Sequence, residues 1–461
     1  LYWFVFKNNL KAQNGFILLA SYVFYGWWDW RFLGLIAFSS LVDYICGLKI
    51  GDAEDTFKRK VYLGISLGVN LGLLGFFKYF NFFIESATDL INTAGFQANP
   101  YSLQLILPVG ISFYTFQTMS YTIDIYRRQM MPTKDAVAFF AYVSFFPQLV
   151  AGPIERAANL LPQFFKRREF IYERGTEGLK LILWGLFKKV VIADNCAMVV
   201  NPIFANYSDA SGLELVLGAV LFAFQIYGDF SGYSDIAIGT GKLLGYDLMT
   251  NFRTPYFSRD IAEFWRRWHI SLSTWFRDYV YIPLGGSQLS EWLSIRNIFF
   301  IFLVSGFWHG ANWTFVFWGG LNAIYFIPVF LQKKNRRFTD NAAEGKYWPS
   351  LKESGQITFT FGLICFAWIF FRSASITDAF AYIQGIYLNP FLPQNFGFIS
   401  YDLRLALLLF ILLEWVGRIY GNWLFMFPQK RWRYAAYASV LYAVIFWGVF
   451  SEPVDFIYFQ F

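Results

Sequence analysis

Two residues able to do acid–base chemistry stand out, because the chain of 461 residues contains only two histidines. His309 lies in the apolar, aromatic run from Val304 to Trp313, which we expect at membrane depth. His269 lies upstream, in the run from Glu263 to Ser271, which is rich in Trp and Arg. An ionisable side chain inside a membrane is costly and marks a functional site by default. Burial favours the neutral imidazole, which can act as a general base.

Both histidines also have structural explanations. His309 could be a buried histidine bonded to a backbone carbonyl, and His269 could be an interfacial residue among snorkelling arginines. In the functional interpretation, Asn312 orients a carbonyl or donates to a developing oxyanion. Basic side chains beside a cavity would then attract a phosphorylated cytosolic donor. The basic residues expected to do so are Arg266, Arg267, Lys188 and Lys189.

Further polar side chains fall inside the apolar segment from Gln225 to Asp235. Acids and hydroxyls in such a segment must face protein or water, and not lipid. They either line a cavity or form a hydrogen-bond network that joins helices. The residues expected to line a cavity, together with Asn312, are Asp229, Ser231, Tyr233, Ser234, Asp235, Trp265, Trp268, Trp308 and Trp313.

The composition is that of a polytopic helical membrane protein. Hydrophobic residues make up 56% of the chain and charged residues 15%, against roughly 25% charged residues in soluble domains. The net charge of +7 comes from short basic clusters beside apolar runs, so it does not indicate nucleic-acid binding. The three cysteines are far apart, and neither they nor the two histidines show the spacing of a metal site.

A hydropathy window of about 19 residues predicts about eleven membrane spans. The apolar residues Leu1 to Phe6 indicate the end of an earlier, truncated span, and we expect a single integral membrane domain over residues 1–461. Placing the basic loops in the cytoplasm puts the C-terminus outside. The predicted spans are 14–29, 30–48, 61–84, 104–125, 178–201, 213–240, 297–311, 313–332, 355–372, 401–421 and 433–450.

Two stretches, residues 135–165 and 257–287, are too polar or too rich in proline for plain spans. We expect them to be re-entrant or interfacial. Irregular backbone at membrane depth is tolerated only where it is buried in protein or lines a water-filled cavity. The chain should therefore enclose a cavity.

Six stretches, in their order and spacing, resemble the membrane-bound O-acyltransferase (MBOAT) superfamily, and more closely its bacterial alginate O-acetyltransferase (AlgI-type) branch. The resemblance covers most of the chain. The six stretches are Pro108 to Gln117, Phe146 to Ile154, Gly228 to Asp235, Asn251 to Tyr256, Phe264 to Tyr279, and Gly306 to Gly310.

The resemblance implies a ring of about 11–12 transmembrane helices and re-entrant segments around a central funnel and tunnel. It places His309 at the family's catalytic position and His269 at its second signature position. It implies a bacterial inner-membrane enzyme that moves an acetyl group from a cytosolic thioester, presumed to be acetyl-CoA. An SGNH-type periplasmic partner would then O-acetylate a polysaccharide such as alginate.

Two other functions stay open from the residues themselves. A carrier would use Asp229 and Asp235 as part of a substrate path through the bilayer. A scaffold would only recruit a periplasmic acetyltransferase. In both cases the chain would do no chemistry of its own.

Overall fold

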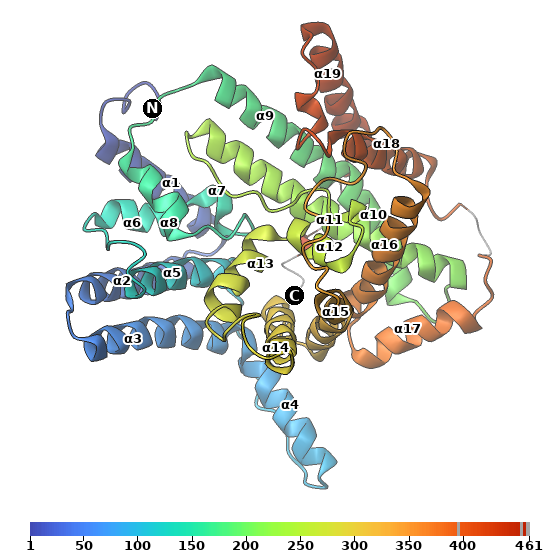
Figure 1. Ribbon diagram of the computed structural model, residues 1–461, viewed down its shortest axis with the longest axis horizontal. Helices are drawn as coiled ribbons and strands as arrows, with labels where there is room; N and C mark the ends of the chain where they lie inside the picture. The colour runs from blue at the N-terminus through green and yellow to red at the C-terminus, as the bar shows by residue number, and fades with distance from the viewer. Residues whose placement is uncertain (394–396, 452–454, 458–461) are drawn as a thin grey trace. The chain divides into compact units, whose positions relative to one another are not determined.

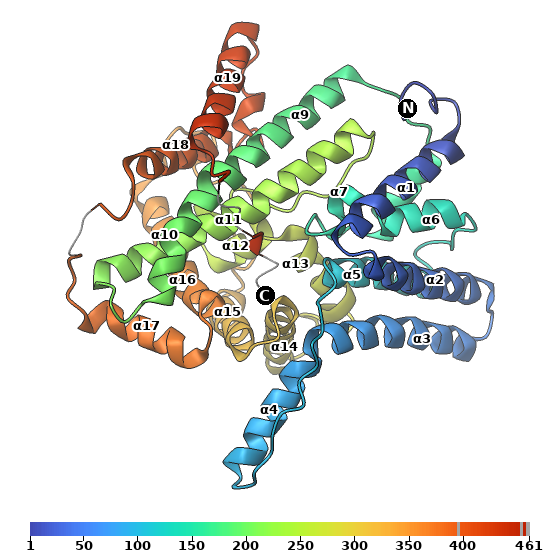
Figure 2. The same ribbon diagram turned by 180° about the vertical axis from the view of Figure 1, so that it is seen from behind.

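The computed structural model describes residues 1–393, 397–451 and 455–457, and within them it contains helices and no strands (Figures 1 and 2). This confirms the all-α class. The chain forms two compact units. Unit 1 comprises Leu1–Gly178 and Thr240–Met249, and unit 2 comprises Leu179–Gly239 and Thr250–Phe461. A single domain over the whole chain stays a prediction.

Unit 1 is built on the helices α2, α3 and α5, which lie side by side in both views (Figures 1 and 2). The short π-helix η1 separates α3 from α4, and α4 extends away from the other helices of this unit. The helices of unit 1 are α1 (Leu10–Trp28), α2 (Arg31–Asp52), α3 (Thr56–Leu74), η1 (Gly75–Tyr79), α4 (Phe80–Thr93), α5 (Ile111–Tyr126), α6 (Ala136–Val143), α7 (Phe146–Leu149), α8 (Ala157–Leu160) and η2 (Leu161–Phe165).

Unit 2 holds both histidines and a core rich in buried aromatic side chains, among them Trp184, Trp268 and Trp368. Two of its helices, α9 and α11, also contribute residues to unit 1. The helices of unit 2 are α9 (Tyr172–Leu186), η3 (Phe187–Ala193), α10 (Asp194–Ala205), α11 (Gly212–Leu243), η4 (Pro255–Phe257), α12 (Ile261–Arg267), α13 (Ile270–Phe276), η5 (Arg277–Tyr281), α14 (Glu291–His309), α15 (Trp313–Leu331), α16 (Leu351–Arg372), α17 (Ile376–Leu388), α18 (Tyr401–Gly417), η6 (Trp423–Phe425) and α19 (Lys430–Trp447).

Every predicted span overlaps a helix, but three details differ. Residues 2–8 form turns and a bend and not the end of a helix. The span predicted from residue 104 becomes helical only at Ile111, because Gly110 adopts the left-handed conformation with φ 76°. The helix α17 was not predicted, since its 13 residues are shorter than the window that detects spans.

Five helices in the described part of the chain are long and apolar enough to cross a membrane. They are Arg31–Asp52, the continuous run Thr56–Thr93, Gly212–Leu243, Trp313–Leu331 and Leu351–Arg372. The polar stretches 135–165 and 257–287 are broken into short helices. The count of about eleven spans and the ring around a funnel stay predictions.

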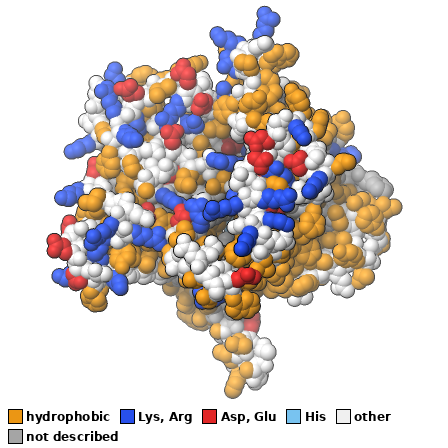
Figure 3. All heavy atoms as spheres, in the orientation of Figure 1, with side chains coloured by type: hydrophobic (Ala, Val, Ile, Leu, Met, Phe, Trp, Pro, Cys, Tyr) orange, Lys and Arg blue, Asp and Glu red, His pale blue; other side chains and the backbone are white. Residues whose placement is uncertain are grey.

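The exposed surface of α4 carries apolar and acidic side chains and no basic residues. Phe83 is 58% exposed and Leu90 is 72% exposed. In Figure 3 the projecting part of the molecule carries hydrophobic, uncharged and acidic side chains. That the basic clusters and the loop after α4 lie on opposite sides of a membrane stays a prediction.

Candidate active site

The two histidines, far apart in sequence, meet inside unit 2. Their ring centroids are 6.2 Å apart. His309 is the last residue of α14, and His269 is the single residue between Trp268 and the start of α13. Both side chains are buried, with exposures of 4% for His309 and 1% for His269. The fold therefore brings the two side chains that the sequence singles out into one buried place.

Aromatic rings surround this pair. Trp308 lies against both imidazoles, with ring centroids 5.0 Å from His309 and 6.0 Å from His269. Such a wall excludes water, which would otherwise hydrolyse a reactive acyl donor. The other nearby rings are Trp318 at 5.2 Å and Phe371 at 5.4 Å from His309, and Phe230 at 4.6 Å from His269.

The positions of the tryptophans expected to line the cavity differ from one another. Trp308 and Trp268 are buried. The ring centroid of Trp265 lies 5.8 Å from that of Trp318, which itself contacts His309. Trp313, at the start of α15, is 55% exposed. Phe371 and Trp318 were missed by the sequence reasoning, because nothing in an aromatic-rich span marks one ring above another. Phe230 lies inside the polar run that was singled out, so that run contained a usable signal.

Asn312 caps the helix that follows the site. Its Oδ1 accepts from the backbone N–H of Thr314 at 3.0 Å, and its Nδ2 donates to the carbonyl of Ala374 at 2.9 Å. The first bond satisfies one of the N–H groups that a helix N-terminus leaves without a partner. The amide nitrogen carries two N–H donors, of which Ala374 takes one, and the oxyanion role of Asn312 stays a prediction.

The two lysines expected to bind the donor face inward from the π-helix η3. Nζ of Lys188 lies 2.9 Å from Oδ2 of Asp235 and 3.6 Å from Oε1 of Glu414. Nζ of Lys189 lies 2.8 Å from Oδ1 of Asp194 and 2.9 Å from Oδ1 of Asp229.

These ion pairs join η3 to α11 and α18. They give Asp229 and Asp235 structural partners, as buried polar groups between helices require. Nothing in this geometry directs Lys188 or Lys189 toward a donor. Ser231 and Ser234 are also buried on α11, and Tyr233 is half-buried there.

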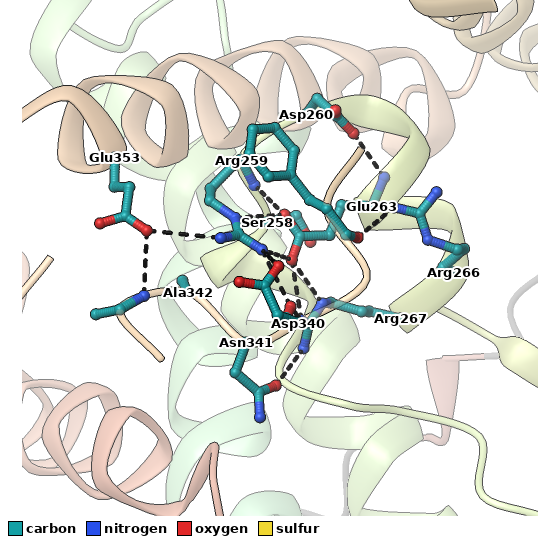
Figure 4. Close-up of polar contacts among 12 residues, drawn as sticks. Ser258, Arg259, Asp260, Glu263, Arg266, Arg267, Asp340, Asn341, Ala342 and Glu353 are labelled. Carbon is teal, nitrogen blue, oxygen red and sulfur yellow. Dashed lines mark hydrogen bonds and ion pairs between the residues drawn. The ribbon is translucent and has the colours of Figure 1, made fainter. Parts of the chain in front are cut away.

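The two arginines expected to bind the donor also have internal partners (Figure 4). The Arg266 guanidinium donates to the carbonyls of Asn335 and, at 2.6 Å, Phe338. Arg267 lies 2.9 Å from Oε1 of Glu263 and donates to the carbonyl of Asp340 at 2.6 Å. Both arginines therefore hold the segment 335–340 against α12.

A third arginine, Arg259, completes this cluster. Its Nε lies 3.1 Å from Oε2 of Glu263, and its Nη2 lies 2.9 Å from Oδ1 of Asp340. The side chain of Arg259 is 4% exposed. The hydrogen bond from Arg259 lowers the pKa of the Asp340 carboxyl, which lies in the loop before α16. All four predicted donor-binding residues are thus explained by contacts within the chain, and donor binding by them stays a prediction.

No group of three or more His, Cys, Asp or Glu side chains that could hold a metal ion occurs among the described residues. Aromatic rings surround the two imidazoles. The two histidines are bases in a dry, aromatic environment. Such an environment suits acyl transfer.

Comparison with known proteins supports the same class of chemistry. The model of the membrane-bound O-acyltransferase (MBOAT) family matches residues 128–371, which include both histidines. The chain belongs to this family, and it is a membrane acyltransferase.

Its curated relatives include the probable alginate O-acetylase AlgI of Pseudomonas putida, which is 40% identical over 80% of this chain and 74% of the relative. The protein of the same name from Pseudomonas aeruginosa is 40% identical over 83% of this chain and 71% of the relative. The peptidoglycan O-acetyltransferase of Helicobacter pylori is 36% identical over 82% of this chain and 74% of the relative. These findings confirm the resemblance drawn from the six sequence stretches.

Proposed function

We propose that the protein moves an acetyl group from acetyl-CoA, on the cytosolic side, toward a polysaccharide outside the bacterial inner membrane. An SGNH-type periplasmic acetyltransferase receives the group and places it on a hydroxyl of a polymer such as alginate. The observation that carries the proposal is the pair of buried imidazoles, 6.2 Å apart within an aromatic wall.

In this proposal His309 is the general base. It takes the proton from the attacking hydroxyl of the acetyl acceptor. The oxygen of that hydroxyl forms a bond to the thioester carbonyl carbon. The carbon–sulfur bond then breaks, and the proton passes from His309 to the departing thiolate. A positioned base contributes typically about 10² to 10⁴ in rate.

His269 is the second catalytic residue of the proposal. A neutral imidazole carries one N–H donor, and a donor directed at the developing oxyanion stabilises it most where water is excluded. The aromatic rings around both histidines supply that exclusion, as the ring distances of 4.6 Å and 5.0 Å indicate.

The acceptor is inferred from the relatives. Proteins named alginate O-acetylase and peptidoglycan O-acetyltransferase, at 40% and 36% identity, support O-acetylation of a polysaccharide. The five apolar helices support a position in the membrane, where the chain would lie with membrane lipids around it.

Radiolabelled acetyl-CoA tests the proposal with purified protein in nanodiscs, with and without the periplasmic partner. The enzyme releases free CoA and yields an acetylated product. A carrier moves a solute without releasing CoA, and a scaffold does neither. Absence of CoA release in the presence of the partner would contradict the proposal.

A further inference from the structure

The segment Asn251–Arg253 holds the backbone on both sides of His269. The N–H of Arg253 donates to the carbonyl of Arg267 at 3.0 Å, two residues before the histidine. The N–H of Ile270, the residue after the histidine, donates to the carbonyl of Asn251 at 2.9 Å. His269 thus lies at the centre of a short clip formed by two backbone hydrogen bonds.

The side chain of Asn251 adds a second layer to this clip. Its Oδ1 accepts from Oγ of Ser271 at 3.0 Å and from the N–H of Ser271 at 3.4 Å. Its Nδ2 donates to Oγ of Ser234 on α11 at 3.3 Å. Asn251 is 1% exposed, so it ties the first turn of α13 to the long helix α11 inside the protein.

The backbone at His269 requires such support. Its φ of 43° lies in the left-handed region, which costs a residue with a side chain roughly 1–2 kcal/mol. Strained conformations persist where the surroundings hold them in place, and they cluster at active sites. Phe252, between the two clip residues, lies 5.1 Å from Trp268 and 6.5 Å from the imidazole itself.

We propose that Asn251 is a positioning residue that fixes the imidazole of His269 beside His309. The inference rests on the proposed function, in which His269 takes part in acetyl transfer. The cause is geometric: without the Asn251 amide, the first turn of α13 loses the hydrogen bonds that join it through Asn251 to α11, and the imidazole moves. A displacement of about 1 Å can cost a factor of about 10² in rate.

A double-mutant cycle tests this role through the rate. Asn251→Ala should lower kcat by about 10- to 100-fold with little change in the KM for the donor. In the His269→Ala background the same substitution should cause no further loss, because it acts through the imidazole that is already gone. An equal loss in both backgrounds, or an unchanged rate, would overturn the proposal.

Histidine NMR provides a readout that does not depend on activity. The chain has only two histidines, so tag-free protein labelled at histidine gives two imidazole signals, which His309→Ala assigns. Asn251→Ala should shift the His269 signal. A His269 signal that stays at the wild-type position in Asn251→Ala would contradict the inference, even if kcat had fallen.

Two further variants serve as a control and as a substitute for Asn251→Ala. Asn422→Ala removes another buried amide, whose Oδ1 accepts from the N–H of Leu424 at 3.0 Å and so caps η6. This control should leave both imidazole signals and kcat unchanged. Ser271→Ala removes one of the Asn251 bonds and replaces Asn251→Ala if that variant does not fold. Wild-type protein without CoA release would refute the proposed function, whereas the NMR comparison would still decide the positioning role.

Discussion

At the residue scale, the carboxylate of Glu263 is a buried counter-ion on α12, the helix that ends just before His269. It lies between the guanidiniums of Arg259 and Arg267, and its side chain is 1% exposed. Removing one partner of a buried ion pair leaves charge without compensation, which costs more than the pair contributes. Arg267, which the sequence suggests as a phosphate ligand, is therefore needed inside the protein.

Glu263→Gln should lower the free energy of unfolding by roughly 3–5 kcal/mol, because two guanidiniums lose their buried counter-ion. Asp340→Asn is the matched control. The Asp340 side chain contacts Arg259 but is 47% exposed, so its loss should cost at most about 1 kcal/mol. Thermal unfolding in detergent measures both, and equal midpoints for the two variants would contradict this account.

At the element scale, the close approach of α14 and α15 sets the position of His309 at the end of α14. A methyl group at Gly306 would collide with the backbone of Phe315, and one at Gly319 would collide with the backbone of Phe302. Neither backbone can yield without separating the helices. The glycines around His309 therefore serve helix packing, as small residues do between membrane helices.

Gly319→Ala should destabilise the protein by about 1–3 kcal/mol through overpacking and slow acetyl transfer by shifting His309. Its neighbour Gly320 offers the control, since a methyl group there would meet only the Leu303 side chain at 3.5 Å. Gly320→Ala should keep wild-type stability and rate. Unfolding midpoints and CoA release of the two variants decide the matter; a tolerated Gly319→Ala would argue against the packing role.

Much of the element structure could be predicted, because runs of about 20 apolar residues have few alternatives to helices. The short helix α17 was missed for its length. Within the site, the rarity of histidine singled out His269 and His309. The partners of Arg266 and Lys188 could not be predicted, since Asn335 lies 69 positions from Arg266, and Asp235 and Glu414 lie 47 and 226 positions from Lys188. Sequence spacing indicates which residues carry charge, and only the fold decides which charges meet.

At the scale of the whole molecule, the distribution of charge predicts an orientation of the chain in the membrane. The five candidate spans and the family membership give a membrane protein. We propose that the basic loops, including the one after α15, face the cytoplasm and that the loop after α4 faces outward. The donor would then reach the protein from the basic side.

Cysteine labelling tests this orientation directly. The three native cysteines, Cys46, Cys196 and Cys365, are buried, so they should give little background. In intact spheroplasts, a membrane-impermeant maleimide should label Gln97→Cys but not Lys334→Cys, and both should react after permeabilisation. Labelling of Lys334→Cys in intact spheroplasts would reverse the orientation.

The central claim is that the chain is an acyltransferase whose chemistry depends on His309. The most direct test compares wild type and His309→Ala in nanodiscs, with radiolabelled acetyl-CoA and the periplasmic partner, after both have shown the same thermal unfolding. The account predicts CoA release by the wild type and a loss of about 10² to 10⁴ in the variant. A folded His309→Ala protein that releases CoA at the wild-type rate would contradict it.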